Sequence, residues 1–504
     1  MSKQTPKPLV ETISNRTFHY FREISQIPRG SGKEQAVADY LTAFAGKNNF
    51  SFKRSTEVIK ERQTCDVVIY KPGTLGYESL DTVVLQAHFD MVCQKTKDSA
   101  HNFDTDPIEI IMNGNQMTAN GTTLGADDGI GVALMLAILE SQDISHPPIE
   151  AFFTSDEEDG MTGVVAVTGE MISGRRLINI DSEDEGVFTY GSAGGIDANV
   201  ILPITYEPTP DNFTFLHIEV AGLMGGHSGV EIHKGRANAH LLLARVLGAI
   251  EDLYALRLVS VHGGDKRNVI TREAGAVIGI ASENVSGIKK LAEEQRSIFA
   301  HEYESIETNI QITVNQDSLT HSQVISAETT DKFIMALLTL PNDIHSMHNN
   351  VENLVGTSCN IGIILQDEES FSFCSHIRSF HHSKKLYVLD KFRRIARLLG
   401  ARFSDGNDYP VWEPNLDSDL IKRFKYAYEN TFTDKKPHFE SIHAGLECGF
   451  ISKKFPDMDM ISCGPTITGA HTPEEMLDID STKRTIELLL NILTQMADDI
   501  ADDI

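Results

Sequence analysis

The sequence predicts an α/β protein with a mostly parallel central sheet and an inserted α+β domain. Strand-like and helix-like stretches alternate over roughly the first 190 residues, which is typical of parallel sheets. Near residue 198 the pattern changes, and apolar and polar residues alternate as they do in half-exposed antiparallel strands. The chain has 504 residues, 41% of them hydrophobic, which is enough for two or three domains with real cores.

The first part supplies the elements of the parallel sheet. Apolar residues recur with helical spacing over residues 36–46 and over residues 127–141 (DDGIGVALMLAILES). Buried strands are expected at residues 82–89 (TVVLQAHF), 149–155 (IEAFFTS) and 175–181 (RRLINID). In open sheets of this kind, ligands bind at the carboxyl ends of the strands.

The inserted part combines half-exposed strands with long helices, and we expect those helices over residues 238–256, 286–305 and 384–400. We therefore assign residues 1–197 and 413–504 to one discontinuous domain and residues 198–412 to the insertion. Hinges are expected near residues 191–195 and near Pro414, and the acidic run ADDIADDI is interpreted as the end of a C-terminal helix.

Charge and targeting signals exclude several classes of protein. Asp and Glu exceed Lys and Arg by 72 − 44 = 28, and so negative a surface repels nucleic-acid phosphates and anionic membranes. The N-terminus lacks the apolar core of a signal peptide, and the longest apolar runs are about half of a membrane span. The six cysteines form no CxxC pair and are interpreted as reduced thiols, so a cytoplasmic protein is expected.

Polar residues at the expected strand ends, together with a distant histidine, are suited to bind two metal ions. Glu157, beside Glu158, would remain free to act as a base on a metal-bound water, so a hydrolase is the first hypothesis. The candidate ligands are His88 in HFD, Asp127 in GADDG, Glu158 in DEEDG, Asp181 in LINID and His471 in GAHTPEE.

Each of these residues also has an ordinary explanation when it is taken alone. Asp127 and Asp128 are good helix N-caps, and Glu157 and Glu158 suit a solvated turn. A buried Asp181 without a partner would be costly, which favours a metal or an arginine beside it. Taken jointly, coincidences at neighbouring strand ends favour the metal site, and three carboxylates, two divalent ions and one hydroxide sum to neutrality.

Two further short motifs of the sequence have a specific interpretation. On a strand, His88 and Asp90 point to the same side, so that Asp90 is placed to accept the second ring N–H of a metal-bound His88. Residues 30–33 (GSGK) resemble part of a phosphate loop. Ile27 and Glu34 stand where such a loop needs Gly and Ser or Thr, and nucleotide binding is rejected.

The motifs together resemble the aminoacyl-histidine dipeptidases of the di-metal peptidase family, which also holds tripeptidase T, carboxypeptidase G and carnosinase-type enzymes. The resemblance spans residues 26–475. It is carried, in order, by HFD, GADDG, DEEDGMTG, LINIDSEDEG, GGHSGVEIH, IHAGLECG and GPTITGAHTPEE.

The resemblance implies a ligand set and a mechanism. Two divalent ions are expected, Zn²⁺ first, with Mn²⁺ or Co²⁺ as alternatives. Glu157 would be the general base for a hydroxide held between the ions, and a cis peptide bond is expected between Asp127 and Asp128. The implied ligands are Asp127 as the bridge, His88 and Asp181 at one ion, and Glu158 and His471 at the other.

For the insertion, the resemblance implies a lid domain that binds substrate. A homodimer formed through this lid is compatible with the family. His227 would stabilise the oxyanion, while Arg378 would grip the substrate carboxylate and Asn268 would add a hydrogen bond. His443 lines the pocket or stabilises its loop, and the two alternatives stay open.

The expected function is metal-dependent hydrolysis of dipeptides of broad specificity, including Xaa-His substrates. A deacylase of N-acyl amino acids or a tripeptide aminopeptidase on the same scaffold is the close alternative. A metal-dependent peptide-binding protein without catalysis is a more distant one, and an acidic scaffold protein is a third. Small peptides are the expected partners, with no nucleic acid and no membrane.

Overall fold

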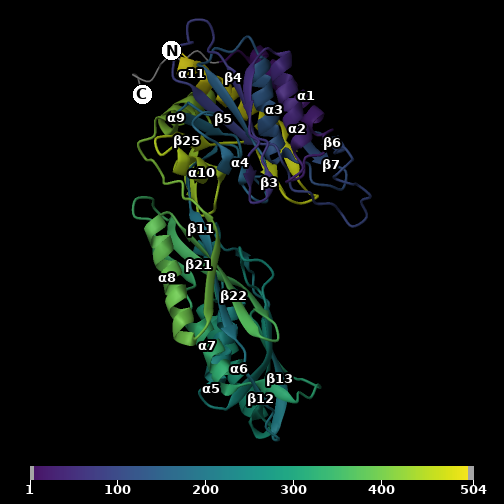
Figure 1. Ribbon diagram of the computed structural model, residues 1–504, viewed down its shortest axis with the longest axis vertical. Helices are drawn as coiled ribbons and strands as arrows, with labels where there is room; N and C mark the ends of the chain where they lie inside the picture. The colour runs from purple at the N-terminus through teal and green to yellow at the C-terminus, as the bar shows by residue number, and fades with distance from the viewer. Residues whose placement is uncertain (1–4, 498–504) are drawn as a thin grey trace. The chain divides into compact units, whose positions relative to one another are not determined.

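The structure is a computed structural model in which residues 5–497 are described, and they form two compact units (Figure 1). The first unit contains the chain up to Ser192, then Pro414–Ser441 and the chain from Leu446 onward. The second contains Ala193–Glu413 and the short segment Ile442–Gly445. The C-terminal run ADDIADDI lies almost wholly outside the described residues.

The first unit is built on a sheet that is parallel at its centre and antiparallel at its edges. Its strands in spatial order are β1 (Ser51–Arg54), β4 (Val67–Lys71), β8 (Ile149–Thr154), β5 (Val83–His88), β9 (Arg176–Asn179), β25 (Asp459–Ser462), β10 (Val187–Ser192) and β24 (His438–Ile442). β5 pairs in parallel with β8 and β9, and β9 pairs in parallel with β25. This confirms the predicted α/β class.

Helices cover this sheet, and the most apolar of them is the most deeply buried. They are α1 (Lys7–Ile24), α2 (Gln35–Lys47), α3 (Ala126–Glu140), α4 (Thr162–Ala166), α9 (Asp419–Thr431), α10 (Glu447–Lys454) and α11 (Ile479–Ala497). α3 has apolar residues on every side and is buried from Ala126 to Leu139, where it packs against β5, β8 and α1. All residues of β5 and β8 are buried, as expected of central parallel strands.

Small antiparallel sheets complete the first unit. They are β26 (Ile467–Thr468), β27 (Met476–Asp478), β7 (Gln116–Ala119) and β6 (Ile110–Asn113), in that order, and the pair β2 (Val58–Ile59) with β3 (Arg62–Gln63). The pairing of β27 with β7 brings the C-terminal part of the chain beside the segment that precedes α3.

The second unit is built on a long sheet in which every recorded strand pairing is antiparallel. Its strands in spatial order are β18 (Gln311–Gln316), β13 (Phe213–Ala221), β17 (Ala274–Ala281), β15 (Leu256–Gly263), β21 (Val355–Gln366), β22 (Ser370–Ser379), β11 (Gly194–Pro203) and β23 (Arg402–Tyr409), and β20 (Asp343–Met347) pairs with β21. β13 alternates buried and partly exposed residues, which confirms the half-exposed pattern expected after residue 198.

Helices of the second unit pack on this sheet with their apolar faces. They are α5 (Ala239–Glu251), α6 (Val285–Glu302), α7 (Ala327–Thr339) and α8 (His382–Leu399). α5 contacts β13 and β17, and α8 contacts β11 and β22. The remaining elements are β12 (Tyr206–Pro208) paired with β19 (Gln323–Ile325), β14 (Gly226–His227) paired with β16 (Val269–Ile270), and the short 3₁₀ helices Ile232–Lys234 and Ser282–Asn284.

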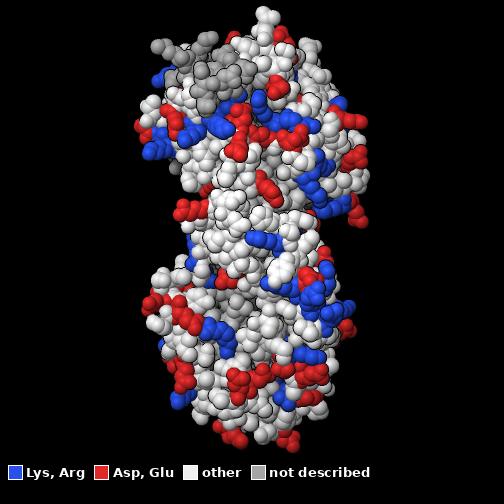
Figure 2. Space-filling model, turned by 90° about the vertical axis from the view of Figure 1, so that its left-hand side faces the viewer, with Lys and Arg blue, Asp and Glu red and all other residues white. Residues whose placement is uncertain are grey.

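The surface charges and the cysteines can be compared with what the composition predicts. On the face drawn in Figure 2, acidic and basic side chains are intermingled. The six cysteines are all free, and each is buried except the partly buried Cys93, as predicted for reduced thiols. Within residues 5–497, no helix has the length and apolarity that crossing a bilayer requires.

Candidate metal centre and active site

Three predicted sets of site residues meet at one edge of the first sheet. His88 is the last residue of β5, while Glu157 and Glu158 follow β8, and Asp181 follows β9. β8, β5 and β9 are parallel neighbours, so their carboxyl ends lie at the same edge. The strand assignments made from the sequence therefore bring these side chains together.

Asp127 connects two groups of donor atoms through its two carboxylate oxygens. Oδ1 lies 3.1 Å from Nε2 of His88, and that nitrogen is also 3.3 Å from Oδ1 of Asp181. Oδ2 lies 3.1 Å from Nε2 of His471, and that nitrogen is also 3.0 Å from Oε1 of Glu158. Asp127 is thus shared between a His88–Asp181 group and a His471–Glu158 group, which is the pairing expected for a bridging ligand.

The spacing of these atoms suits metal ions. In each of the two groups, the ligand atoms all lie within 4.8 Å of one another, and His88, Glu157 and Glu158 form a third such group. Imidazole nitrogens and carboxylate oxygens are the donors that zinc and related ions take in mixed sites. The residues present therefore fit two divalent cations.

Electrostatics of the cluster point the same way. Burial acts to lower the pKa of His88, but the carboxylates of Asp181 and Asp127 raise that pKa well above its usual value. Hydrogen bonds to Asp127 and Glu158 raise the pKa of His471 to about 11. Both shifts mean that the surrounding carboxylates favour positive charge in their midst, as a cation site requires.

Asp90 fixes the backbone of Glu157 and Glu158. Its Oδ1 accepts the backbone N–H of Glu157 at 3.0 Å, and its Oδ2 accepts that of Glu158 at 3.2 Å. Oδ1 also lies 3.4 Å from Nδ1 of His88, which is the contact predicted for a carboxylate behind a metal-bound imidazole. The hydroxyl of Ser31 donates to Oδ2 at 2.7 Å, so the GSGK stretch supports Asp90.

Glu157 occupies a partly buried position beside the cluster. Burial raises the pKa of its carboxyl well above the usual value, against the opposing charge of His88. The preceding residue, Asp156, has φ 57°, and its carboxylate accepts hydrogen bonds from Arg62 and Thr162. His471 also has a positive φ, 64°. Left-handed backbone at non-glycine residues is costly and is concentrated at functional sites.

The turn that carries Asp127 depends on residues that sequence reasoning missed. The carboxylate of Glu475 accepts the backbone N–H groups of Leu124, Gly125, Ala126 and Asp127 at 2.7, 2.9, 2.7 and 3.3 Å. In the sequence, Glu475 is the second of two adjacent glutamates after His471, and the pattern does not show that only the second is buried. The peptide bond between Asp127 and Asp128 is cis, as expected.

Two further buried residues were missed for the same reason. Arg29 is 2% exposed and donates to the carbonyls of Phe89 and Asp90 at 3.0 Å each, and to that of Gly125. Glu447 is 1% exposed, and its Oε2 accepts from Gln86 at 2.6 Å and from Thr154 at 2.8 Å. Burial raises the pKa of Glu447 to about 8. The one usable signal was the charge of Glu447 within IHAGLECG.

The second unit brings three predicted lid residues around one glycine. A Cβ built on Gly229 would lie 2.4 Å from the carbonyl oxygen of His443, 2.9 Å from Nε of Arg378 and 2.9 Å from Cε1 of His227. Only a residue without a side chain allows this approach. Asn268 is exposed, and its carbonyl accepts the N–H of Ser228 at 2.8 Å, next to His227.

The hydrogen bonds of this group fix the tautomer of His227 and the position of His443. Nδ1 of His227 accepts the N–H groups of Gly229 and Val230 at 3.2 and 3.1 Å, which leaves the ring proton on Nε2. Burial, with the charge of Arg378, lowers the pKa of His227 to about 4, so the ring is neutral at pH 7. Nε2 of His443 lies 2.7 Å from Oγ of Ser358, and this buried contact fixes the 442–445 segment.

A shared aspartate between two histidine–carboxylate groups, with a partly buried glutamate beside it, is the arrangement of side chains expected in a two-metal hydrolase. Comparison with known proteins identifies the family. Residues 84–495 match the peptidase family M20/M25/M40. The chain is 37% identical over 497 residues to the cytosol non-specific dipeptidase of Escherichia coli, covering 98% of this chain and 99% of that protein.

Solved structures agree with this result. The aminoacylhistidine dipeptidase from Vibrio alginolyticus is 38% identical, with a TM-score of 0.86 and 97% of each chain covered. Human carnosine dipeptidase 1 shares the fold, with a TM-score of 0.51 at 13% identity over 98% of this chain and 99% of that one. The chain belongs to the peptidase family M20/M25/M40 and is a peptide hydrolase.

Proposed function

We propose that this protein is a metal-dependent dipeptidase of broad specificity that includes Xaa-His substrates. The observation that carries the proposal is the position of Asp127, whose two carboxylate oxygens face separate histidine–carboxylate groups 3.1 Å away on each side. The relatives whose names include dipeptidase and aminoacylhistidine dipeptidase support the substrate class, because they match almost the full length of this chain.

The proposed metal ligands are the five residues predicted from the sequence, with Zn²⁺ as the first candidate and Mn²⁺ or Co²⁺ as alternatives. Such ions supply two things when they are bound: a lowered pKa for water and polarisation of the substrate carbonyl. The ligands are His88 and Asp181 on one side of Asp127, and Glu158 and His471 on the other.

Glu157 is the proposed general base. Its carboxylate accepts a proton from the attacking water and returns that proton to the leaving amine. The N–H···Oδ1 bond from Glu157 to Asp90 fixes the backbone at this residue, and the adjacent bond from Glu158 fixes the neighbouring ligand. Burial raises the pKa of Glu157, which moves its proton affinity toward the range that an efficient base needs.

The second unit is proposed to recognise the substrate. A neutral His227 with its proton on Nε2 is suited to donate to a developing oxyanion. Arg378 is 5% exposed, and its Nη1 donates to the hydroxyl of Tyr409 at 2.7 Å, while Nε has no hydrogen-bond partner among the described residues. We assign this unpartnered N–H to a substrate carboxylate. Asn268 and His443 complete the proposed substrate-binding set.

Localisation and assembly follow as proposals from the relatives and the resemblance. The name of the Escherichia coli relative places that protein in the cytosol, and we propose the same compartment here. We also propose that the first unit is the catalytic domain and that the second mediates any homodimer.

A substrate panel combined with metal removal tests the proposed function. The protein should hydrolyse dipeptides, including Xaa-His, faster than tripeptides or N-acetyl amino acids, as measured by release of free amino acids. Exhaustive chelation should abolish this activity, and added Zn²⁺, Mn²⁺ or Co²⁺ should restore it. Full activity after chelation would refute the metal site. A preference for N-acetyl amino acids or tripeptides would instead support the deacylase or aminopeptidase alternative.

Substitution of Arg378 by Lys tests the carboxylate-binding role. Lysine keeps the charge but loses the planar two-pronged donor, so KM for dipeptides should rise by about 10-fold to 100-fold, the equivalent of about 1.5–3 kcal/mol for a charged hydrogen bond. Arg245→Lys is the matched control, since Arg245 pairs with Glu302 between α5 and α6. An unchanged KM for Arg378→Lys would contradict the assignment. A dipeptide amide lacks the free carboxylate, so its KM should differ little between Arg378→Lys and Arg245→Lys.

A further inference from the structure

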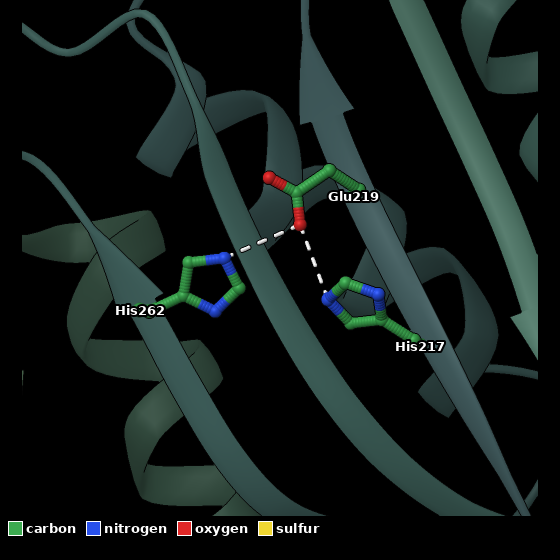
Figure 3. Close-up of side chains that lie close together, drawn as sticks. All are labelled: His217, Glu219 and His262. Atoms are coloured by element: carbon green, nitrogen blue, oxygen red, sulfur yellow. Dashed lines mark ion pairs between the residues drawn. The ribbon is translucent and has the colours of Figure 1, made fainter. Parts of the chain in front are cut away.

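Two histidines and a glutamate gather on the sheet of the second unit, apart from the residues assigned above. His217 and Glu219 lie on β13, and His262 lies on β15. Nε2 of His217 is 3.2 Å, and Nε2 of His262 is 3.3 Å, from the same oxygen, Oε2 of Glu219. Figure 3 shows both imidazole rings turned toward that oxygen.

The sheet brings these side chains together across an intervening strand. In the order β13–β17–β15, Gly275 of β17 is paired with Glu219 on one side and with His262 on the other. A Cβ at Gly275 would lie 2.2 Å from Oε2 of Glu219 and 2.4 Å from Cε1 of His262. The missing side chain therefore makes the space in which residues of two non-adjacent strands meet.

The contacts within the cluster leave its central oxygen without a hydrogen bond. Oε2 of Glu219 is buried and has no hydrogen-bond partner among the described residues, although both imidazole nitrogens lie near it. A buried carboxylate oxygen that accepts no hydrogen bond is unfavourable, and neutral imidazoles at 3.2 and 3.3 Å do not compensate its charge. A cation placed between the three side chains would compensate for this charge.

We infer that His217, Glu219 and His262 form a further binding site for a divalent transition metal such as Zn²⁺. The three donor atoms lie within 4.8 Å of one another. Two atoms that each coordinate zinc at about 2.0–2.1 Å in a tetrahedron are about 3.3 Å apart. The two measured nitrogen–oxygen distances, 3.2 and 3.3 Å, match that spacing.

The site is open to solvent on one side. The side chains of His262, His217 and Glu219 are 58%, 38% and 23% exposed, so solvent reaches the cluster directly. Three protein ligands with an open side leave a fourth position for water or for a group from outside. An ion bound here would link β13 to β15 across β17 and thereby fasten three strands of the sheet.

Counting bound Zn²⁺ tests this inference. The full-length protein and its variants are dialysed against buffers of fixed free Zn²⁺, from nanomolar to micromolar, and the metal in each is measured by mass spectrometry. His262→Ala and His217→Ala should each bind one Zn²⁺ fewer per chain than the unaltered protein. His301→Ala is the matched control, because His301 is an exposed histidine beside Glu304 in the same unit.

Gly275→Ala provides a variant that keeps all three ligands. The added methyl group occupies the space between Glu219 and His262, so the affinity for the additional Zn²⁺ should fall at least about tenfold. Peptide hydrolysis with Zn²⁺ present should be unchanged in all these variants, which separates this ion from those of the first unit. Equal Zn²⁺ content in the unaltered protein and both histidine variants would overturn the inference, as would an equal loss in His301→Ala.

Discussion

Substitution of Glu157 by Gln should lower kcat for dipeptide hydrolysis by about 10²-fold to 10⁴-fold, the usual contribution of a general base. The amide has nearly the same shape but cannot take a proton from water. The metal content should remain that of the unaltered protein, because Glu157 is not one of the five proposed ligands. Steady-state kinetics and metal analysis of the same preparation measure both quantities.

The metal analysis gives this experiment its power to discriminate. The possible ligand atoms of Glu157, His88 and Glu158 lie within 4.8 Å of one another, so Glu157 could itself bind metal. Its assignment as a base and not a ligand therefore needs a direct check. A loss of bound metal together with activity would show that Glu157 is a ligand, and an unchanged kcat would show that it is not the base. Asp159→Asn is the control. Asp159 lies in the same turn as Glu157, is exposed and pairs with Arg62.

Asp127→Ala should remove both catalytic ions and all measurable activity. Each oxygen of Asp127 faces a different histidine–carboxylate group. Its loss should therefore lower the affinity for both ions by more than the roughly 10-fold to 100-fold seen when a residue that only supports a metal ligand is removed. Metal analysis at fixed free Zn²⁺ measures the effect.

Asp181→Ala serves as the comparison for the bridging role. Asp181 approaches only the His88 side of the cluster, so this variant should lose one catalytic ion and keep the other. If Asp127→Ala also retained one catalytic ion, the two groups would not share a ligand, and the bridging assignment would be wrong. Zinc bound in the second unit would be present in both variants and cancels in the comparison.

The strand ends were predictable because a buried strand and the turn after it each have a recognisable pattern in a short stretch of sequence. The apolar runs before His88, Glu157 and Asp181 identify strands, and parallel pairing then places their ends at one edge. The pairing of His471 with Asp127 and Glu158 was inferred by resemblance, since nothing local connects it to a turn more than three hundred residues earlier.

The residues that support the site were not predictable by the same reasoning. Glu475 accepts four backbone N–H groups, and Arg29 donates to three backbone carbonyls. Backbone partners leave no pattern of side-chain types in the sequence, so a buried acid or base of this kind reads as an ordinary surface charge. Gly229 and Gly275 were missed likewise, because close approach is visible only once the neighbouring strands are placed.

The segment Ile442–Gly445 has a consequence for exchanging parts between members of the family. Because these residues belong to the second unit, a graft of Ala193–Glu413 alone would be incomplete. It would combine the donor's equivalent of Ser358 with the recipient's equivalent of His443, two residues that meet here at 2.7 Å. A chimaera that keeps this unit intact must carry both pieces of chain. If only the long piece were exchanged, the Ser358 and His443 equivalents would come from different proteins.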